Sequence, residues 1–224
     1  MGRFSLLFDL DGTLVDSDAL HLLAFAEVLQ GAGVVVDEAY YRSHIAGRSN
    51  DLIIAEAFPA ASREQRISLA ARKEAFYRDN LAAIRIVPGA REIIRWAKTE
   101  DMQCAIVTTS PRTSVEAVLK STALIECFDL LVVGDEVQRG KPDPLPYLTA
   151  LLKLGIGPGD AIAFEDSLPG LASATGAGIA TVGMLASLDE RTARLAGAVR
   201  TAKDFLDVGL QPWLGKRRAA SPLM

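Results

Sequence analysis

Short apolar segments alternate with stretches of helical spacing along most of the chain. Five segments are mostly apolar on both faces: residues 3–8, 104–107, 130–133, 161–164 and 179–182. Segments of this length are typical of central parallel strands that helices cover on both sides. Helical spacing lies between them in residues 91–98, 114–121 and 144–154. The pattern predicts a doubly wound, Rossmann-like α/β fold with a parallel sheet, in which ligands bind beyond the carboxyl ends of the strands.

Residues 17–84 interrupt this alternation. They show no strand pattern, and helical spacing recurs in residues 19–30, 51–57 and 63–80. We interpret residues 17–84 as an all-helical cap domain, inserted into an α/β core that consists of residues 1–16 and 85–224. The tail from Gly209, which contains Lys216, Arg217 and Arg218, is expected to be solvated or frayed.

Composition narrows the possible partners. The 224 residues are 50% hydrophobic, enough for a substantial core, and 28 acidic against 24 basic residues give a net charge of −4. That charge offers no general attraction for nucleic acid, and no apolar run reaches the roughly 18 residues of a membrane span. Two cysteines are too few for a disulfide framework. We expect a soluble, cytoplasmic protein that binds neither nucleic acid nor membrane and is a monomer or weak homodimer.

Acidic residues follow two of the predicted strands. Asp9 and Asp11 end the first strand, where residues i and i+2 point to the same side, and Glu165 and Asp166 end the fourth. Neighbouring carboxylates repel each other and need a cation or a proton, and their oxygens are ligands that Mg²⁺ prefers. The alternative is that these residues are ordinary turns and helix caps.

Two further predicted strands, the second and the third, are followed by groups that suit an anion. Thr108, Thr109, Ser110 and Arg112 come after the second strand, at a turn that leads into a helix and could cradle a phosphate. Lys141 comes after the third, in a loop made rigid by glycine and proline. Taken singly, these residues could be a helix N-cap and a surface lysine. Because four successive strand ends carry such groups, we favour a functional site over independent turns and caps.

These residues together resemble the haloacid dehalogenase superfamily. The resemblance spans about residues 4–205 and is carried by Asp9-Leu10-Asp11-Gly12-Thr13, by Thr108, by Lys141 and by Glu165-Asp166. The helical insertion resembles the cap of the subgroup that holds β-phosphoglucomutase and the phosphoglycolate phosphatase-like enzymes.

The resemblance implies catalytic roles for four residues. Asp9 is the expected nucleophile, which forms an aspartyl-phosphate. Asp11 is the expected acid and base, protonating the leaving oxygen and later deprotonating the attacking water. Thr108 is expected to hydrogen-bond the phosphoryl oxygens, and Lys141 to neutralise charge on Asp9 and on the phosphoryl group.

The resemblance also implies a Mg²⁺ site. The expected ligands are Asp9, Asp166 and the backbone carbonyl of Asp11, with Glu165 as a direct or outer partner. The presence of Asp11 argues against carbon–halogen cleavage, because dehalogenases of the superfamily lack this second aspartate.

Substrate recognition is expected in the cap. His21 and Lys73 match residues with which β-phosphoglucomutases bind sugar phosphates, although His21 could pack between the domains and Lys73 could lie on a solvated helix face. The cap loop with Gly47, Arg48 and Asn50 is the other expected contact. The mutases carry a phosphate-binding arginine where this chain has Asn50, and Arg48 could substitute for it.

The resemblance therefore predicts a Mg²⁺-dependent phosphatase acting on a small phosphorylated metabolite, such as a sugar phosphate. Thr13 favours this activity, since phosphatases of the family commonly have threonine where β-phosphoglucomutases tend to have valine. One alternative is a β-phosphoglucomutase-type mutase. A second is a non-catalytic binding protein, which the intact set from Asp9 to Asp166 disfavours.

Overall fold

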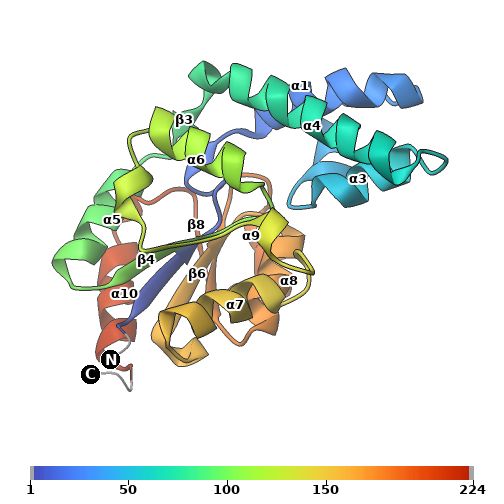
Figure 1. The fold of residues 1–224 in the computed structure, drawn as a ribbon. Coiled ribbons are helices and arrows are strands. Elements are labelled where there is room, and N and C mark those ends of the chain that lie inside the picture. The colour runs from blue at the N-terminus through green and yellow to red at the C-terminus, as the bar shows by residue number, and fades with distance from the viewer. Residues whose placement is uncertain (1–2, 222–224) are drawn as a thin grey trace.

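The computed structural model describes residues 3–221 and contains a six-stranded parallel sheet with helices on both faces (Figure 1). The strand order is β5-β4-β1-β6-β7-β8. In chain order the strands are β1 (Ser5–Phe8), β4 (Gln103–Val107), β5 (Leu130–Val132), β6 (Ala161–Glu165), β7 (Ala180–Met184) and β8 (Arg200–Ala202). The predicted parallel α/β fold is confirmed, and all five predicted strands lie in the sheet.

The two faces of the sheet have separate cores because alternate residues of each strand point to opposite sides. One face packs on α5 (Ala90–Thr99), α6 (Arg112–Ser121) and α10 (Leu210–Ala219). The other packs on α7 (Leu145–Leu154) and α8 (Leu168–Gly176). In β1, Phe8 faces the first core and stacks on Phe164 of β6 at 4.9 Å, whereas Leu7 faces the second.

The segment between the short strands β2 (Val15–Asp16) and β3 (Arg85–Ile86) contains only helices. These two strands pair antiparallel, so the chain leaves the core and returns to it at one place. The main helices of the segment are α1 (Asp18–Leu29), α3 (Asn50–Ala57) and α4 (Arg63–Asp79), with the short α2 (Glu38–Tyr40) and η2 (Tyr41–Ile45) between them. Figure 1 shows them gathered beyond one end of the sheet.

This helical segment has a small core of its own, formed by buried side chains of α1, η2 and α3. The members are Phe25, Leu29, Val36, Tyr41, Ile45 and Ile53. The helical content of residues 17–84 agrees with the sequence analysis, and we refer to this segment as the cap. That the cap is a separate domain stays a prediction, and residues 1–2 and 222–224 of the predicted core lie outside the described residues.

The C-terminal tail differs from the expectation. Residues Leu210–Ala219 form α10, in which Leu210 and Leu214 are fully buried against the sheet. These leucines are four residues apart and share one helix face, whereas the basic residues that suggested a solvated tail lie in its last turn. The short elements β8 and α9 (Glu190–Leu195) were not predicted, because three and six residues are too few for a periodic pattern.

Within residues 3–221, no helix combines the length and the apolar character that a membrane span requires.

We expect Leu214→Ala to lower the free energy of unfolding by about 2–5 kcal/mol, because it leaves a cavity between α10 and the sheet. Gly215→Ala is the matched control, since a methyl group at that position meets no atom within 4 Å. It should be neutral or stabilise the helix by up to about 1 kcal/mol. Urea unfolding measures both, and an unchanged stability of Leu214→Ala would contradict the packing of α10.

Candidate active site

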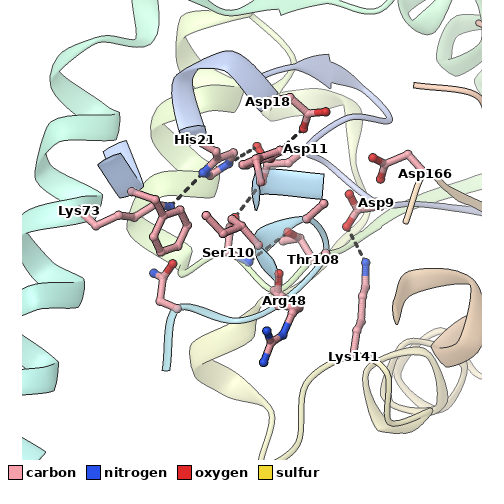
Figure 2. A pocket seen from close by; sticks show the side chains of 17 residues that line it. Asp9, Asp11, Asp18, His21, Arg48, Lys73, Thr108, Ser110, Lys141 and Asp166 are labelled. Carbon is pink, nitrogen blue, oxygen red and sulfur yellow. Dashed lines mark hydrogen bonds and ion pairs between the residues drawn. The ribbon is translucent and has the colours of Figure 1, made fainter. Parts of the chain in front are cut away.

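Three neighbouring strands each place a polar side chain at the same edge of the sheet (Figure 2). Asp9 follows β1, Thr108 follows β4 and Asp166 follows β6. The hydrogen bonds of the sheet continue one residue past β1 and β4. The Asp9 amide donates to the Phe164 carbonyl and the Thr108 amide to the Val132 carbonyl, both at 3.0 Å. Because β1 lies between β4 and β6, these side chains meet.

Asp9, Glu165 and Asp166 form a buried acidic cluster. One carboxylate oxygen of each lies within 4.8 Å of the others, and Glu165 Oε2 is buried without a hydrogen-bond partner in the described chain. Gly12 leaves room for the cluster, because its φ is +75° and a Cβ there would lie 2.2 Å from Asp166 Oδ2. Three buried carboxylates with a free oxygen fit Mg²⁺, which binds through hard oxygen ligands.

The side chain of Asp11 lies outside this cluster. Its carboxylate accepts hydrogen bonds from Ser17 Oγ (2.6 Å), Tyr77 Oη (2.9 Å) and Ser110 Oγ (2.8 Å). The convergence that extended geometry predicted for Asp9 and Asp11 therefore does not bring both carboxylates into one cluster, because Asp11 turns toward the cap. The role of its backbone carbonyl as a metal ligand stays a prediction.

Lys141 is the cation of the core site. Its Nζ lies 2.5 Å from Asp9 Oδ1 and 2.5 Å from Glu165 Oε1, and the side chain is buried. Tyr147 of α7 donates a hydrogen bond of 2.6 Å to the same Glu165 oxygen. The lysine is therefore no surface residue, and it bridges the predicted nucleophile and the acidic pair.

Burial and charge shift the pKa values of these groups. Burial and the neighbouring acids raise the pKa of Asp9 above its usual range, although the charge of Lys141 opposes them. Burial, Asp9 and Asp18 raise that of Asp166. Burial alone would lower the pKa of Lys141, but Asp9 and Glu165 outweigh it and raise the pKa. Without a bound metal ion, Asp9 and Asp166 therefore favour their protonated forms, and metal binding would displace these protons.

Asp11 behaves in the opposite way. Burial alone would raise its pKa, but the neighbouring His21 and the hydrogen bonds from Ser17 and Ser110 outweigh burial and hold the pKa below its usual range. His21 Nε2 lies 3.0 Å from Asp11 Oδ1. In this arrangement Asp11 is an ionised carboxylate that binds cap and core together.

The cap residues His21 and Lys73 are buried side by side. Lys73 Nζ lies 2.9 Å from His21 Nδ1 and donates to Glu74 Oε1 at 2.8 Å. Since Lys73 donates to Nδ1, the imidazole proton is assigned to Nε2, which faces Asp11. The open alternative for Lys73, a solvated helix face, is wrong, because only 1% of the residue is exposed.

The cap loop approaches the core closely at Gly47. Its φ is +72°, and a Cβ there would lie 2.3 Å from Ser167 Oγ in the loop after β6, so a side chain does not fit. Arg48 lines the cavity but pairs with Glu56, at 2.5 Å, and its guanidinium points away from Asp9 in Figure 2. Asn50 donates to Glu74 at 2.8 Å.

Most of the predicted site residues line one small cavity of about 50 Å³ between cap and core. Thr108, Thr109 and Ser110 are among its lining residues, and the Ser110 amide donates to Thr108 Oγ1 at 3.1 Å. Arg112 does not line this cavity. Its guanidinium pairs instead with Glu136 and, at 3.4 Å, with Glu116. The position of Arg112 therefore does not support the predicted contact of this residue with the substrate.

Several lining or neighbouring residues were not identified from the sequence. They are Ser17, Asp18, Phe25, Tyr41, Ile45, Glu74 and Tyr77. Asp18 accepts hydrogen bonds from Tyr41 Oη (2.9 Å) and from Ser187 Oγ (3.1 Å), which also donates to Asp166 at 3.2 Å. Their only sequence signal is that each lies within a few positions of His21, Gly47 or Lys73, because residues far apart in the chain meet here.

Comparison with known proteins points to one protein family. The sequence profile of the haloacid dehalogenase-like hydrolases matches residues 6–184, which is most of the chain. The chain is 33% identical over 203 residues to validoxylamine A 7'-phosphate phosphatase of Streptomyces hygroscopicus subsp. limoneus, covering 90% of this chain and 94% of that protein. It is 31% identical over 203 residues to a phosphorylated carbohydrates phosphatase of Thermotoga maritima, covering 89% and 94%.

A solved structure agrees with these relatives. The chain superimposes with a TM-score of 0.81 on a CbbY variant from Rhodobacter sphaeroides in complex with xylulose-(1,5)bisphosphate, with 30% sequence identity and coverage of 92% of this chain and 96% of that one. The resemblance inferred from the motifs is confirmed by both kinds of comparison.

The raised pKa of Asp9 predicts a pH dependence of the metal-free protein. The folded chain keeps a proton on Asp9 at pH values where the unfolded chain, with a pKa of about 4, has lost it, so ionisation costs stability as the pH rises. An asparagine in its place cannot ionise, so the stability of Asp9→Asn relative to the unmodified chain should increase from pH 5 to pH 8. Urea unfolding in EDTA across this range measures the difference, and a constant or falling value would contradict the assignment.

Proposed function

The chain belongs to the haloacid dehalogenase-like hydrolases, and on this premise we propose that it is a Mg²⁺-dependent phosphatase of small phosphorylated metabolites. The observation that carries the proposal is the contact of Asp9 with Lys141, at 2.5 Å, beside the buried carboxylates of Glu165 and Asp166. A nucleophilic carboxylate must attack an anionic phosphoryl group, and nearby positive charge reduces their repulsion.

In the first step a carboxylate oxygen of Asp9 attacks phosphorus, and the bond from phosphorus to the leaving oxygen breaks. The products are an aspartyl-phosphate on Asp9 and an alcohol, which takes its proton from Asp11. Lys141 stays beside Asp9 throughout and balances the charge that collects on the phosphoryl oxygens. Thr108 and the amides that follow it donate hydrogen bonds to those oxygens.

In the second step Asp11 accepts a proton from a water molecule, which attacks phosphorus and releases phosphate and free Asp9. The ionised state of Asp11 suits this step. The first step needs the protonated form, which the approach of an anionic substrate favours because a neighbouring like charge raises the pKa of a carboxylate. The buried contacts of His21 and Tyr77 with Asp11 exclude water while the cap is closed.

Asp9, Asp166 and the backbone carbonyl of Asp11 would hold Mg²⁺, with Glu165 as a further partner. The bound ion would supply Lewis acidity to the phosphoryl oxygens. Burial raises the pKa of Asp9 and of Asp166, and a bound metal ion would favour their ionised forms.

The names of the relatives support phosphorylated carbohydrates or similar organic phosphates as the substrate class. His21, Lys73 and the loop with Gly47, Arg48 and Asn50 would face the leaving group from the cap. We further propose that the protein works in the cytoplasm as a monomer or weak homodimer.

A β-phosphoglucomutase-type activity is the second candidate, but it must hold a bisphosphate intermediate by its distal phosphate. Asn50 stands where those mutases carry an arginine, and its amide is bound to Glu74. Arg48, which could replace that arginine, is paired with Glu56. Hydrolysis is therefore the better supported activity. The presence of every catalytic residue from Asp9 to Asp166 disfavours a purely binding role.

The first experiment is phosphate release from a panel of sugar and polyol phosphates, with β-glucose 1-phosphate also assayed for conversion to glucose 6-phosphate. Asp9→Asn should lower turnover by at least about three orders of magnitude while the protein stays folded, because the nucleophile is lost. Conversion of β-glucose 1-phosphate without net phosphate release would favour the mutase. Near-normal turnover of Asp9→Asn would refute the mechanism.

Removal of the metal is a second test. Mg²⁺ should raise the melting temperature of the unmodified protein, because it binds the folded acidic cluster and not the unfolded chain. Asp166→Asn should lose most of this shift, and EDTA should abolish phosphate release. Asp129→Asn, in a surface ion pair with Lys98 far from the cluster, is the matched control and should keep the Mg²⁺ shift. An equal shift in Asp166→Asn would argue against the site.

A further inference from the structure

The basic side chains that line the cavity are already bound by groups of this chain. Four such side chains line it: His21, Arg48, Lys73 and Lys141. Lys141 serves the nucleophile, and His21 lies between Lys73 and the Asp11 carboxylate. Recognition of a second anionic group on the substrate would therefore depend on Lys73 or Arg48.

Lys73 is enclosed on every side. Its Nζ contacts His21 Nδ1 at 2.9 Å and Glu74 Oε1 at 2.8 Å. The same atom lies 4.9 Å from the centre of the Phe25 ring and 5.1 Å from that of Tyr77. Two hydrogen-bond partners and two aromatic rings therefore already surround the ammonium group. The charge of Lys73 is thus satisfied before any ligand arrives.

Glu74 is the carboxylate that satisfies it. Oε1 accepts from Lys73 and from Asn50 Nδ2, both at 2.8 Å, and Oε2 accepts from Ser114 Oγ of the core helix α6. Burial alone would raise the pKa of Glu74, but Lys73 and these hydrogen bonds outweigh it and lower the pKa, so the group is ionised at neutral pH. Pulling Lys73 away would leave a buried carboxylate without its cation, which is strongly unfavourable.

The other charges around the cavity do not favour a second anion. Arg48 donates to Glu56 through both terminal nitrogens of its guanidinium, Nη1 and Nη2. The Asp18 carboxylate adds negative charge to the lining of the cavity. The adjoining cavity of about 370 Å³ contains Arg78, but Asp51, Glu74 and Asp135 line it as well.

On the basis of the proposed phosphatase activity, we propose that Glu74 determines specificity. By holding Lys73 and Asn50, it restricts the site to phosphomonoesters whose leaving group is uncharged, such as a sugar or polyol hydroxyl. Substrates that carry a second phosphate or a carboxylate are disfavoured, because no cation of the cavity is free to bind that group.

Two pairs of substrates test this on the unmodified protein. In each pair the second compound carries an additional anionic group on the leaving group: 2-hydroxyethyl phosphate against 2-phosphoglycolate, and glucose 6-phosphate against glucose 1,6-bisphosphate. We expect kcat/KM to be at least about tenfold higher for the uncharged member. Calorimetric binding of the same compounds to Asp9→Asn, with Mg²⁺ present, should show the same preference without turnover.

Glu74→Gln releases Lys73 with almost no change in shape. It should shift the ratio of kcat/KM toward the charged member by about tenfold or more, and the charged substrate should gain in absolute terms. Glu27→Gln is the matched control at the exposed ion pair of Glu27 with Arg72 on the cap, which does not line the cavity, and it should move the ratio by less than about threefold.

The possible failures are distinguishable. Equal or better hydrolysis of the charged members by the unmodified protein would overturn the specificity proposal and leave the phosphatase proposal intact. An equal fall for both members in Glu74→Gln, or an equal shift in Glu27→Gln, would likewise show that Glu74 has only a structural role. Absence of phosphate release from the whole panel would overturn the phosphatase proposal and this one with it.

Discussion

The site depends on one buried lysine that is shared by two carboxylates. Lys141 lies 2.5 Å from both Asp9 and Glu165, and all three side chains are buried at the end of the sheet. Desolvated charges are stable only when paired, so the loop that carries Lys141 must dock where β1 and β6 end. The same pairing keeps the Asp9 carboxylate next to a positive charge, which phosphoryl transfer requires.

The cap is joined to the core through hydrogen bonds to two carboxylates. Asp11 of the core accepts from the cap residue Tyr77 and contacts His21, while Glu74 of the cap accepts from Ser114 of the core. Both carboxylates have pKa values below their usual range because these contacts outweigh burial. Asp11 and His21 also line the cavity between cap and core, so two of the groups that hold the parts together belong to the candidate site.

The core of the site could be predicted from sequence, and its cap side only in part. Asp9, Thr108, Lys141 and Asp166 each follow a strand that an apolar segment marks, and parallel strands end at one edge, so their meeting follows from topology. Arg112 was assigned to the same edge but turns toward Glu136, because a local sequence does not reveal which acid lies nearby. The wrong expectation for α10 has a similar origin, since a basic cluster concealed two buried leucines.

The sequence by itself determined the parallel α/β fold, the helical insertion and the order of the reactive groups. These features depend on periodicity and on residues within a few positions of one another. Only the tertiary structure decided that Lys73 is buried against Glu74, that Asp11 turns to the cap and that Arg48 pairs with Glu56. Which charges are neutralised depends on contacts between segments distant in sequence, and a local pattern does not reveal such contacts.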